Sequence, residues 1–235
     1  MTRYSVLVCA TFLSASFLKA ETPKAASPES VASYTATSAN VSGAPDTIRI
    51  DILRWSTDAE RDKLMNAWSQ KPENAGRGGN GRGGRGGGAA RGGAARGGRG
   101  GGEPAVAPPP LPEAMLATAL KEATTVGYLW SREVAGYAIR YAGKMANPDG
   151  SERIVLITQR RLGAVNDLWK PAGADPPDYD FSVIELRVKA NGTGEGKTSL
   201  NGKVAPDASL KMITLENYDT LPVVFSHVQR AGTHN

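Results

Sequence analysis

Alternating apolar and polar residues predict a strand at 47–53. Ile48, Ile50 and Ile52 are separated by Arg49 and Asp51, which gives the two-residue period of a strand with one buried face. Ordered structure is therefore expected from this strand onward.

A helix is predicted directly after this strand. Thr57 and Glu60 have the spacing of a capping box, in which the hydroxyl accepts from an early backbone N–H and the carboxylate reaches back. Leu64 and Met65 precede Trp68 by about one helical turn, so one face of this helix is apolar.

A second helix is predicted from Pro112, because proline suits the first turn of a helix. Its apolar stripe consists of Met115, Leu116, Ala119 and Leu120, and Gly127 is expected to mark its end. Between the two helices lies an insert at 71–111, rich in Gly, Arg and Ala at 76–102 and in Pro at 104–110. No apolar core can form from such a composition.

The rest of the chain predicts strands, from short apolar or alternating runs separated by turn signals. These runs lie at 128–130, 137–141, 154–158, 182–188, 197–204, 210–215 and 223–228. In the run at 182–188 the apolar residues share one face, with Glu185 and Arg187 on the other. The expected fold class is α+β, with a mostly antiparallel sheet of six to eight strands packed with two helices and a disordered Gly/Arg-rich insert between the helices.

The N-terminus has the pattern of an export signal at 1–20. Arg3 is followed by the apolar run Val6–Leu13 and then by small residues, with cleavage expected after Ala20 or, alternatively, after Ser16. The run is shorter than the about 20 residues that a transmembrane helix needs, so no transmembrane segment is expected. The other predicted parts are a disordered lead-in at 21–45, a single domain at 46–230 interrupted by the insert at 71–111, and a frayed tail at 231–235. The mature chain is expected to be soluble and either periplasmic or secreted, in a bacterium.

Cysteine content and charge narrow the function classes. Cys9 is the only cysteine and lies in the predicted signal, so the mature chain would have neither a disulfide nor a thiolate metal site. The net charge of +5 does not describe the predicted domain. Arg3 and Lys19 lie in the signal and six arginines lie in the insert, which leaves 20 of the 28 basic residues. Against 23 acidic residues, these give a net charge of −3. The predicted domain therefore has no basic excess that would attract nucleic acid.

Six Arg-Gly-Gly triplets in the insert form a candidate anion-binding site, at Arg77, Arg82, Arg85, Arg91, Arg96 and Arg99. Arginine and glycine together give charge without fixed structure and bind phosphate backbones in a salt-dependent manner. The spacers are Gly, Ala and Asn, not the aromatic residues common in RNA-binding tracts. Behind an export signal, the tract is expected to be either a solvated spacer or a binder of anionic polymers and surfaces, such as extracellular DNA, acidic glycan or lipid headgroups.

The segment 191–198 ends in Gly-Lys-Thr and is one glycine short of a phosphate-binding P-loop. That motif needs a following helix whose N-terminal amides hold the phosphates. Gly202 and Pro206 oppose a helix here, and Asn191-Gly192 favours a tight turn, so a hairpin is predicted instead.

Asp175, Asp178 and Asp180 cluster in a Pro-rich loop near Asp167. Carboxylates at this spacing can bind calcium, but the loop lacks the glycine and the closing Glu of an EF-hand. A solvated acidic turn is the preferred interpretation, with a weak cation site as the alternative. No metal or other cofactor is predicted.

Catalytic candidates are few. His234 lies in the predicted tail, and His227, in the last strand, is interpreted as a satisfied structural residue with no Gly-x-Ser-x-Gly elbow to accompany it. Glu185 and Glu216 can form a carboxylate pair of the kind that glycosidases use, but an outward charge is expected at each strand position. No catalytic residue is therefore predicted.

Two segments resemble exported bacterial proteins of unknown function. They are 46–61, which contains the strand and the capping box, and Leu215-Glu216-Asn217-Tyr218. The resemblance covers the predicted domain but not the insert, and it implies export from a bacterium without implying an activity or catalytic residues.

The sequence favours a non-enzymatic binding or envelope-associated domain. One alternative is a binder of anionic polymers that acts through the Arg-Gly-Gly tract, and a second is a hydrolase with an unrecognised site. A deep cleft lined by Glu185, Glu216 or His227 would favour the hydrolase.

Overall fold

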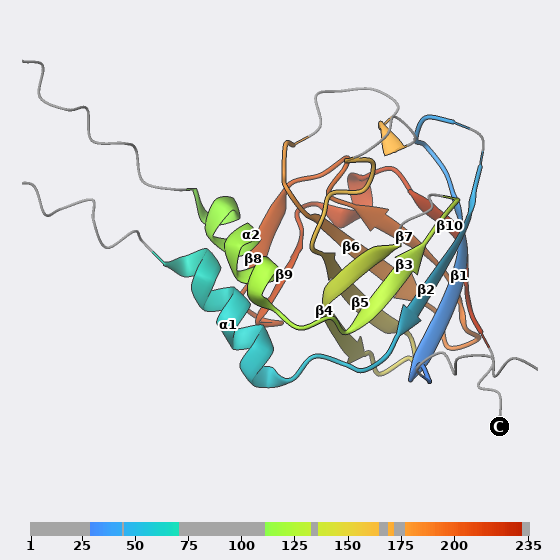
Figure 1. Cartoon of the computed structure of the whole chain (residues 1–235). Coiled ribbons are helices and arrows are strands. Elements are labelled where there is room, and N and C mark those ends of the chain that lie inside the picture. Colours follow the sequence, from blue (N-terminus) through green and yellow to red (C-terminus); the bar gives the residue numbers. More distant parts are fainter. Residues whose placement is uncertain are drawn as a thin grey trace, which may run out of the picture.

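The computed structural model describes residues 29–43, 45–70, 111–132, 136–164, 169–171 and 177–231. Within these ranges the chain forms a closed barrel of antiparallel strands with two α-helices against its outer side (Figure 1). The barrel strands are β1 (Ala32–Ser38), β2 (Thr47–Ile52), β3 (Gly127–Trp130), β4 (Tyr137–Ala146), β5 (Glu152–Thr158), β6 (Ser182–Val188), β7 (Thr193–Thr198) and β10 (Phe225–Arg230). Helices α1 (Asp58–Ser69) and α2 (Pro112–Glu122) follow β2, and β8 (Val204–Asp207), β9 (Met212–Leu215) and the 3-10 helix η2 (Tyr218–Thr220) follow β7.

The barrel closes because β1 has a partner on each side. Ala36 of β1 lies opposite Ile48 of β2, and Tyr34 of β1 lies opposite Arg230 of β10. The other strands pair in sequence order from β2 to β7, and β10 joins β7. All eight pairings are antiparallel, so successive residues of each strand point alternately into and out of the barrel.

The predicted mostly antiparallel α+β fold with two helices is confirmed, and closure into a barrel goes beyond that prediction. The predicted disorder of 21–45 is wrong for its described part, where β1 completes the barrel. Tyr34 and Ala36 of this strand are only 1% and 4% exposed. The pattern was missed because Ala, Ser and Thr fill the neighbouring positions and give little hydrophobic contrast.

The interior of the barrel is filled with side chains. Ile50, Leu129, Ile184 and Phe225, from four different strands, are all fully buried in one cluster. An eight-stranded barrel is just wide enough for its inward side chains to fill it. The interior is therefore a packed core.

A second apolar core lies outside the barrel. Val155 and Ile157 of β5 point outward and are fully buried, because α1, α2 and the β8–β9 hairpin cover them. Leu64 of α1 and Leu116 and Leu120 of α2 supply the facing apolar surface, as the helix stripes predict. Of the described helices, none has the length and apolar content needed to cross a bilayer.

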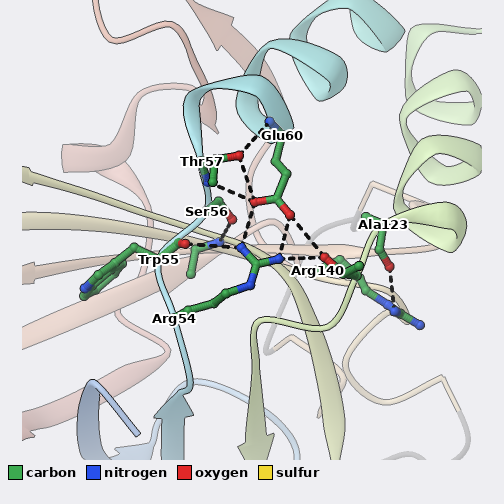
Figure 2. Close-up of polar contacts among 9 residues, drawn as sticks. Arg54, Trp55, Ser56, Thr57, Glu60, Ala123 and Arg140 are labelled. Atoms are coloured by element: carbon green, nitrogen blue, oxygen red, sulfur yellow. Dashed lines mark hydrogen bonds and ion pairs between the residues drawn. The ribbon is translucent and has the colours of Figure 1, made fainter.

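A polar network ties the start of α1 to the end of α2 (Figure 2). The predicted capping box is present, with Thr57 and Glu60 satisfying each other's backbone N–H groups. The Glu60 carboxylate also accepts hydrogen bonds from both terminal nitrogens of Arg54, at 2.6 and 2.8 Å, and from the Thr124 hydroxyl at 3.1 Å. Arg140 of β4 donates from Nη1 to the Ala123 carbonyl at 2.6 Å, which satisfies an unpaired carbonyl at the C-terminal end of α2.

Two predicted boundaries are corrected. Gly127 does not end the second helix, which stops at Glu122, but begins β3, where a Cβ would lie 2.5 Å from the Asp51 carbonyl oxygen. Glycine is needed there for the close approach of β2. The strand predicted at 197–204 is β7, which ends at Thr198, and a turn separates it from β8.

Replacing Glu60 is expected to destabilise the protein in a pH-dependent way. The hydrogen bonds from Arg54 lower the pKa of Glu60 from 4.5 to about 2. Because the folded-state pKa is depressed, the stabilisation is complete above pH 4.5 and is lost as the pH falls through 2. Allowing for solvent screening, Glu60→Gln should cost about 1–2 kcal/mol at pH 7.

Urea unfolding of the parent chain and of Glu60→Gln, at about pH 7, 4 and 2.5, measures this effect above and inside the expected window. Glu122→Gln is the matched control, because its exposed ion pair with Lys63 at 3.4 Å should contribute less than about 0.5 kcal/mol. A Glu60→Gln deficit that does not shrink with falling pH contradicts the assignment.

Candidate functional site

The strand register places three charged side chains and a methionine in a row on the outer face of the barrel. Met145 of β4 lies opposite Arg153 of β5, which lies opposite Arg187 of β6, which lies opposite Glu195 of β7. The residues before and after each of them along the strand are on the inner face. We call these four residues the outer row.

An open groove of about 900 Å³ lies along the outer row. The β4–β5 turn adds Asp149 to its lining and β10 adds His227. This volume falls within the range of about 300–1,000 Å³ that is typical of small-molecule sites. Since the barrel interior is packed, this outer groove is the candidate site.

A buried carboxylate holds the two arginines of the outer row. The side chain of Glu185 is 0% exposed, although it points outward, because η2 and the β8–β9 hairpin lie beside it. Arg153 donates from Nη2 to Glu185 at 3.0 Å, and its Nε forms an ion pair at 2.8 Å without hydrogen-bond alignment. Arg187 Nε approaches the same carboxylate at 3.4 Å. A buried charge persists only when it is paired in this way.

Lys197 fixes η2 against the barrel. It lies opposite Glu185, is 5% exposed, and donates from Nζ to the Tyr218 carbonyl at 2.9 Å and to the Asp219 carbonyl at 3.3 Å. The Lys197 ammonium lies 4.6 Å from the centre of the Tyr218 ring, and the Arg187 guanidinium lies 3.7 Å from the centre of the same ring. Two cations therefore share one aromatic ring beside the outer groove.

His227 lies at a β-bulge in β10, where the register against β7 shifts between Phe225 and Val228. Its φ of 51° is in the left-handed region, which histidine adopts more readily than most residues. The interpretation of His227 as a satisfied structural residue is wrong. The side chain is exposed, lines the groove, and makes no hydrogen bond or ion pair with any other described residue. Bulges commonly re-aim a side chain beside a site.

Several predicted candidates lie outside the described residues, among them the arginines from Arg77 to Arg99, Asp167, Asp175 and His234. Anion binding by the Arg-Gly-Gly tract therefore stays a prediction. Of the acidic loop, Asp178 is 99% exposed and pairs with Arg161 at 3.3 Å, and Asp180 is also exposed. The part of the chain that the structure describes contains no cluster of three metal-ligating side chains.

The other two sequence candidates have different outcomes. Glu185 is buried and ion-paired, whereas Glu216, just after β9, is exposed.

The P-loop-like segment is a hairpin, as predicted. Gly192 has a φ of 82°, and its N–H donates to the Lys189 carbonyl at 2.8 Å.

The arginines of the outer row were missed at the sequence level. Each occupies an outward strand position, where a solvated charge is the ordinary expectation. The turn at 147–150 aligns Met145 with Arg153, and the turn at 189–192 aligns Arg187 with Glu195, so counting outward from the turns would have found each pair. The pairing of Arg153 with Arg187 depends on the β5–β6 register, and no short turn sets it.

Comparisons with known proteins give no match, neither to a family model, nor to a curated protein, nor to a solved structure. The chemistry of the groove therefore carries the functional proposal.

Tyr218→Phe is expected to be neutral or stabilising by up to about 1 kcal/mol. The Tyr218 hydroxyl is buried without a hydrogen-bond partner among the described residues, and burial raises its pKa well above the usual value. Phenylalanine removes the unpaired hydroxyl but keeps the ring that Arg187 and Lys197 contact.

Tyr137→Phe is the matched control for thermal and urea unfolding. The Tyr137 hydroxyl accepts the Gly163 N–H at 2.9 Å, so its loss should cost about 1–2 kcal/mol. If Tyr218→Phe is destabilised as much as Tyr137→Phe, the Tyr218 hydroxyl has a partner in solution.

Proposed function

We propose that the protein is a non-enzymatic binding domain whose ligand site is the outer groove. The observation that carries this proposal is the outer row itself. Arg153 and Arg187 are fixed by a fully buried carboxylate on the lining of a groove that is large enough for a small molecule. Side chains held in this way recognise a ligand without losing much conformational freedom.

Binding is favoured over hydrolysis by how the polar groups of the groove are used. The Ser151 hydroxyl donates to Asp149 at 2.6 Å, and the Ser151 N–H donates to the same carboxylate oxygen at 2.9 Å. This pair closes the β4–β5 turn and is two residues apart, so it stabilises the turn. Glu152 is paired with Arg230 and Lys144. These carboxylates serve the structure instead of activating a nucleophile.

Export to the periplasm or the cell exterior belongs to the proposal, on the strength of the signal pattern at 1–20. In that setting the ligand would be a small polar solute encountered outside the cytoplasm. The first alternative, binding of anionic polymers by the Arg-Gly-Gly tract, involves a separate part of the chain and is compatible with this site.

Blocking the groove tests the proposal. The test begins with a thermal-shift screen of carboxylates, phosphates, sugars and amino acids, followed by amide chemical shifts for each compound that binds. Thr193→Trp should weaken groove ligands at least about tenfold, because Thr193 is exposed and lines the groove, where an indole would occupy ligand space.

Thr47→Trp is the matched control, an exposed strand threonine outside the groove lining, and it should leave the affinity unchanged. If no compound binds, the outer groove is not the site. The same holds if the compounds that bind shift amides outside the groove and keep their affinity in Thr193→Trp.

A further inference from the structure

Arg187 is the cation of the outer row with the greatest access to a ligand. Its side chain is 43% exposed, against 18% for Arg153. The Tyr218 ring supports its guanidinium from one side at 3.7 Å, and Glu185 holds Nε at 3.4 Å. The orientation of the guanidinium is therefore set before any ligand arrives.

The donors of Arg187 are only partly used. Nη1 donates to Asp219 at 2.7 Å, while Nη2 makes no hydrogen bond with any residue that the structure describes. Arg153 differs, because Nε and Nη2 face Glu185 and Nη1 lies 3.6 Å from Asp207. A guanidinium can offer two parallel N–H groups to one anion. On the Nη1–Nη2 edge of Arg187, Asp219 is the only described residue that accepts a hydrogen bond.

Asp219 is a weakly held counter-ion. Its side chain is 86% exposed, and Arg187 is the partner to which it is bound. An exposed Arg–Asp pair contributes only about 0–1 kcal/mol, so another anion can replace this carboxylate at small cost.

We propose that Arg187 anchors a single anionic oxygen group of the groove ligand, a carboxylate or a phosphate, and that this group displaces Asp219. The inference rests on the outer groove being the ligand site. Glu195 lies opposite Arg187 and is 50% exposed, so its charge disfavours ligands that carry several negative groups along the groove. The site thus selects a ligand with one anionic group.

The test uses sodium phosphate and sodium acetate as probes of the full chain, at constant ionic strength with chloride as the replaced anion. Amide shifts and the Arg187 Nε–Hε resonance report binding. Asp219→Asn removes the competing charge and should tighten binding of the preferred probe about two- to fivefold. Arg187→Lys loses the paired donors and should weaken it at least about fivefold.

Asp178→Asn is the matched control, because Asp178 is an exposed partner of Arg161 at 3.3 Å and its removal changes net charge by the same amount. Its affinity for either probe should equal that of the parent chain. The probe that binds more tightly identifies the anionic group as carboxylate or phosphate.

An equal rise in probe affinity in Asp219→Asn and Asp178→Asn would show that net charge alone causes the effect, and this result would overturn the inference. An unchanged affinity in Asp219→Asn overturns it as well, and this exposed substitution carries little risk of unfolding the protein. If a screened ligand occupies the groove but neither probe does, the inference fails while the binding function stands. If nothing occupies the groove, both fail.

Discussion

The pairing of β1 with β10 is the contact on which the other features depend, because it turns a series of hairpins into a closed barrel. Ser226 donates to the Thr37 carbonyl at 2.9 Å across a sequence separation of 189 residues, so closure joins the two ends of the described chain. Once the sheet is closed, no barrel edge is left unpaired, and every strand has an inner and an outer face. The inner faces make one core, and the outer faces of β4 to β7 contribute to both the helix layer and the outer groove.

Glu185 lies on the border between these two outer regions. Its neighbour across β5 is Val155, in the apolar layer, and its neighbour across β7 is Lys197, under η2. Burying this carboxylate has a large desolvation cost that two arginines offset, so the arrangement gives little net stability. Its physical effect is positional: it holds Arg153 and Arg187 in one geometry beside the groove. A site built on strands in this way is more rigid than one built on loops.

Local patterns predicted most of the elements, but not how they close. The isoleucines of β2, the capping box at Thr57 and the turn at Asn191-Gly192 are short-range signals, and each is borne out. β1 was missed because Ala, Ser and Thr give weak contrast, although Tyr34 is buried. The burial of Glu185 was missed because the residues that cover it lie far away in the sequence, in the β8–β9 hairpin and η2, and no local period encodes how they pack. His227 was misassigned because a bulge changes the direction of a side chain without changing the sequence pattern.

The helix pair has a consequence for how this chain can change over evolutionary time. Lys63 of α1 meets Glu122 of α2, so the helices run antiparallel, and the end of α1 lies beside the start of α2 (Figure 1). The 40 residues from 71 to 110 therefore join two points that the fold already holds together. Each doubling of such a connection costs only about 0.6 kcal/mol of closure entropy. Selection for stability therefore acts weakly on the length of this connection, so the number of residues between α1 and α2 can change while the barrel and its groove stay the same.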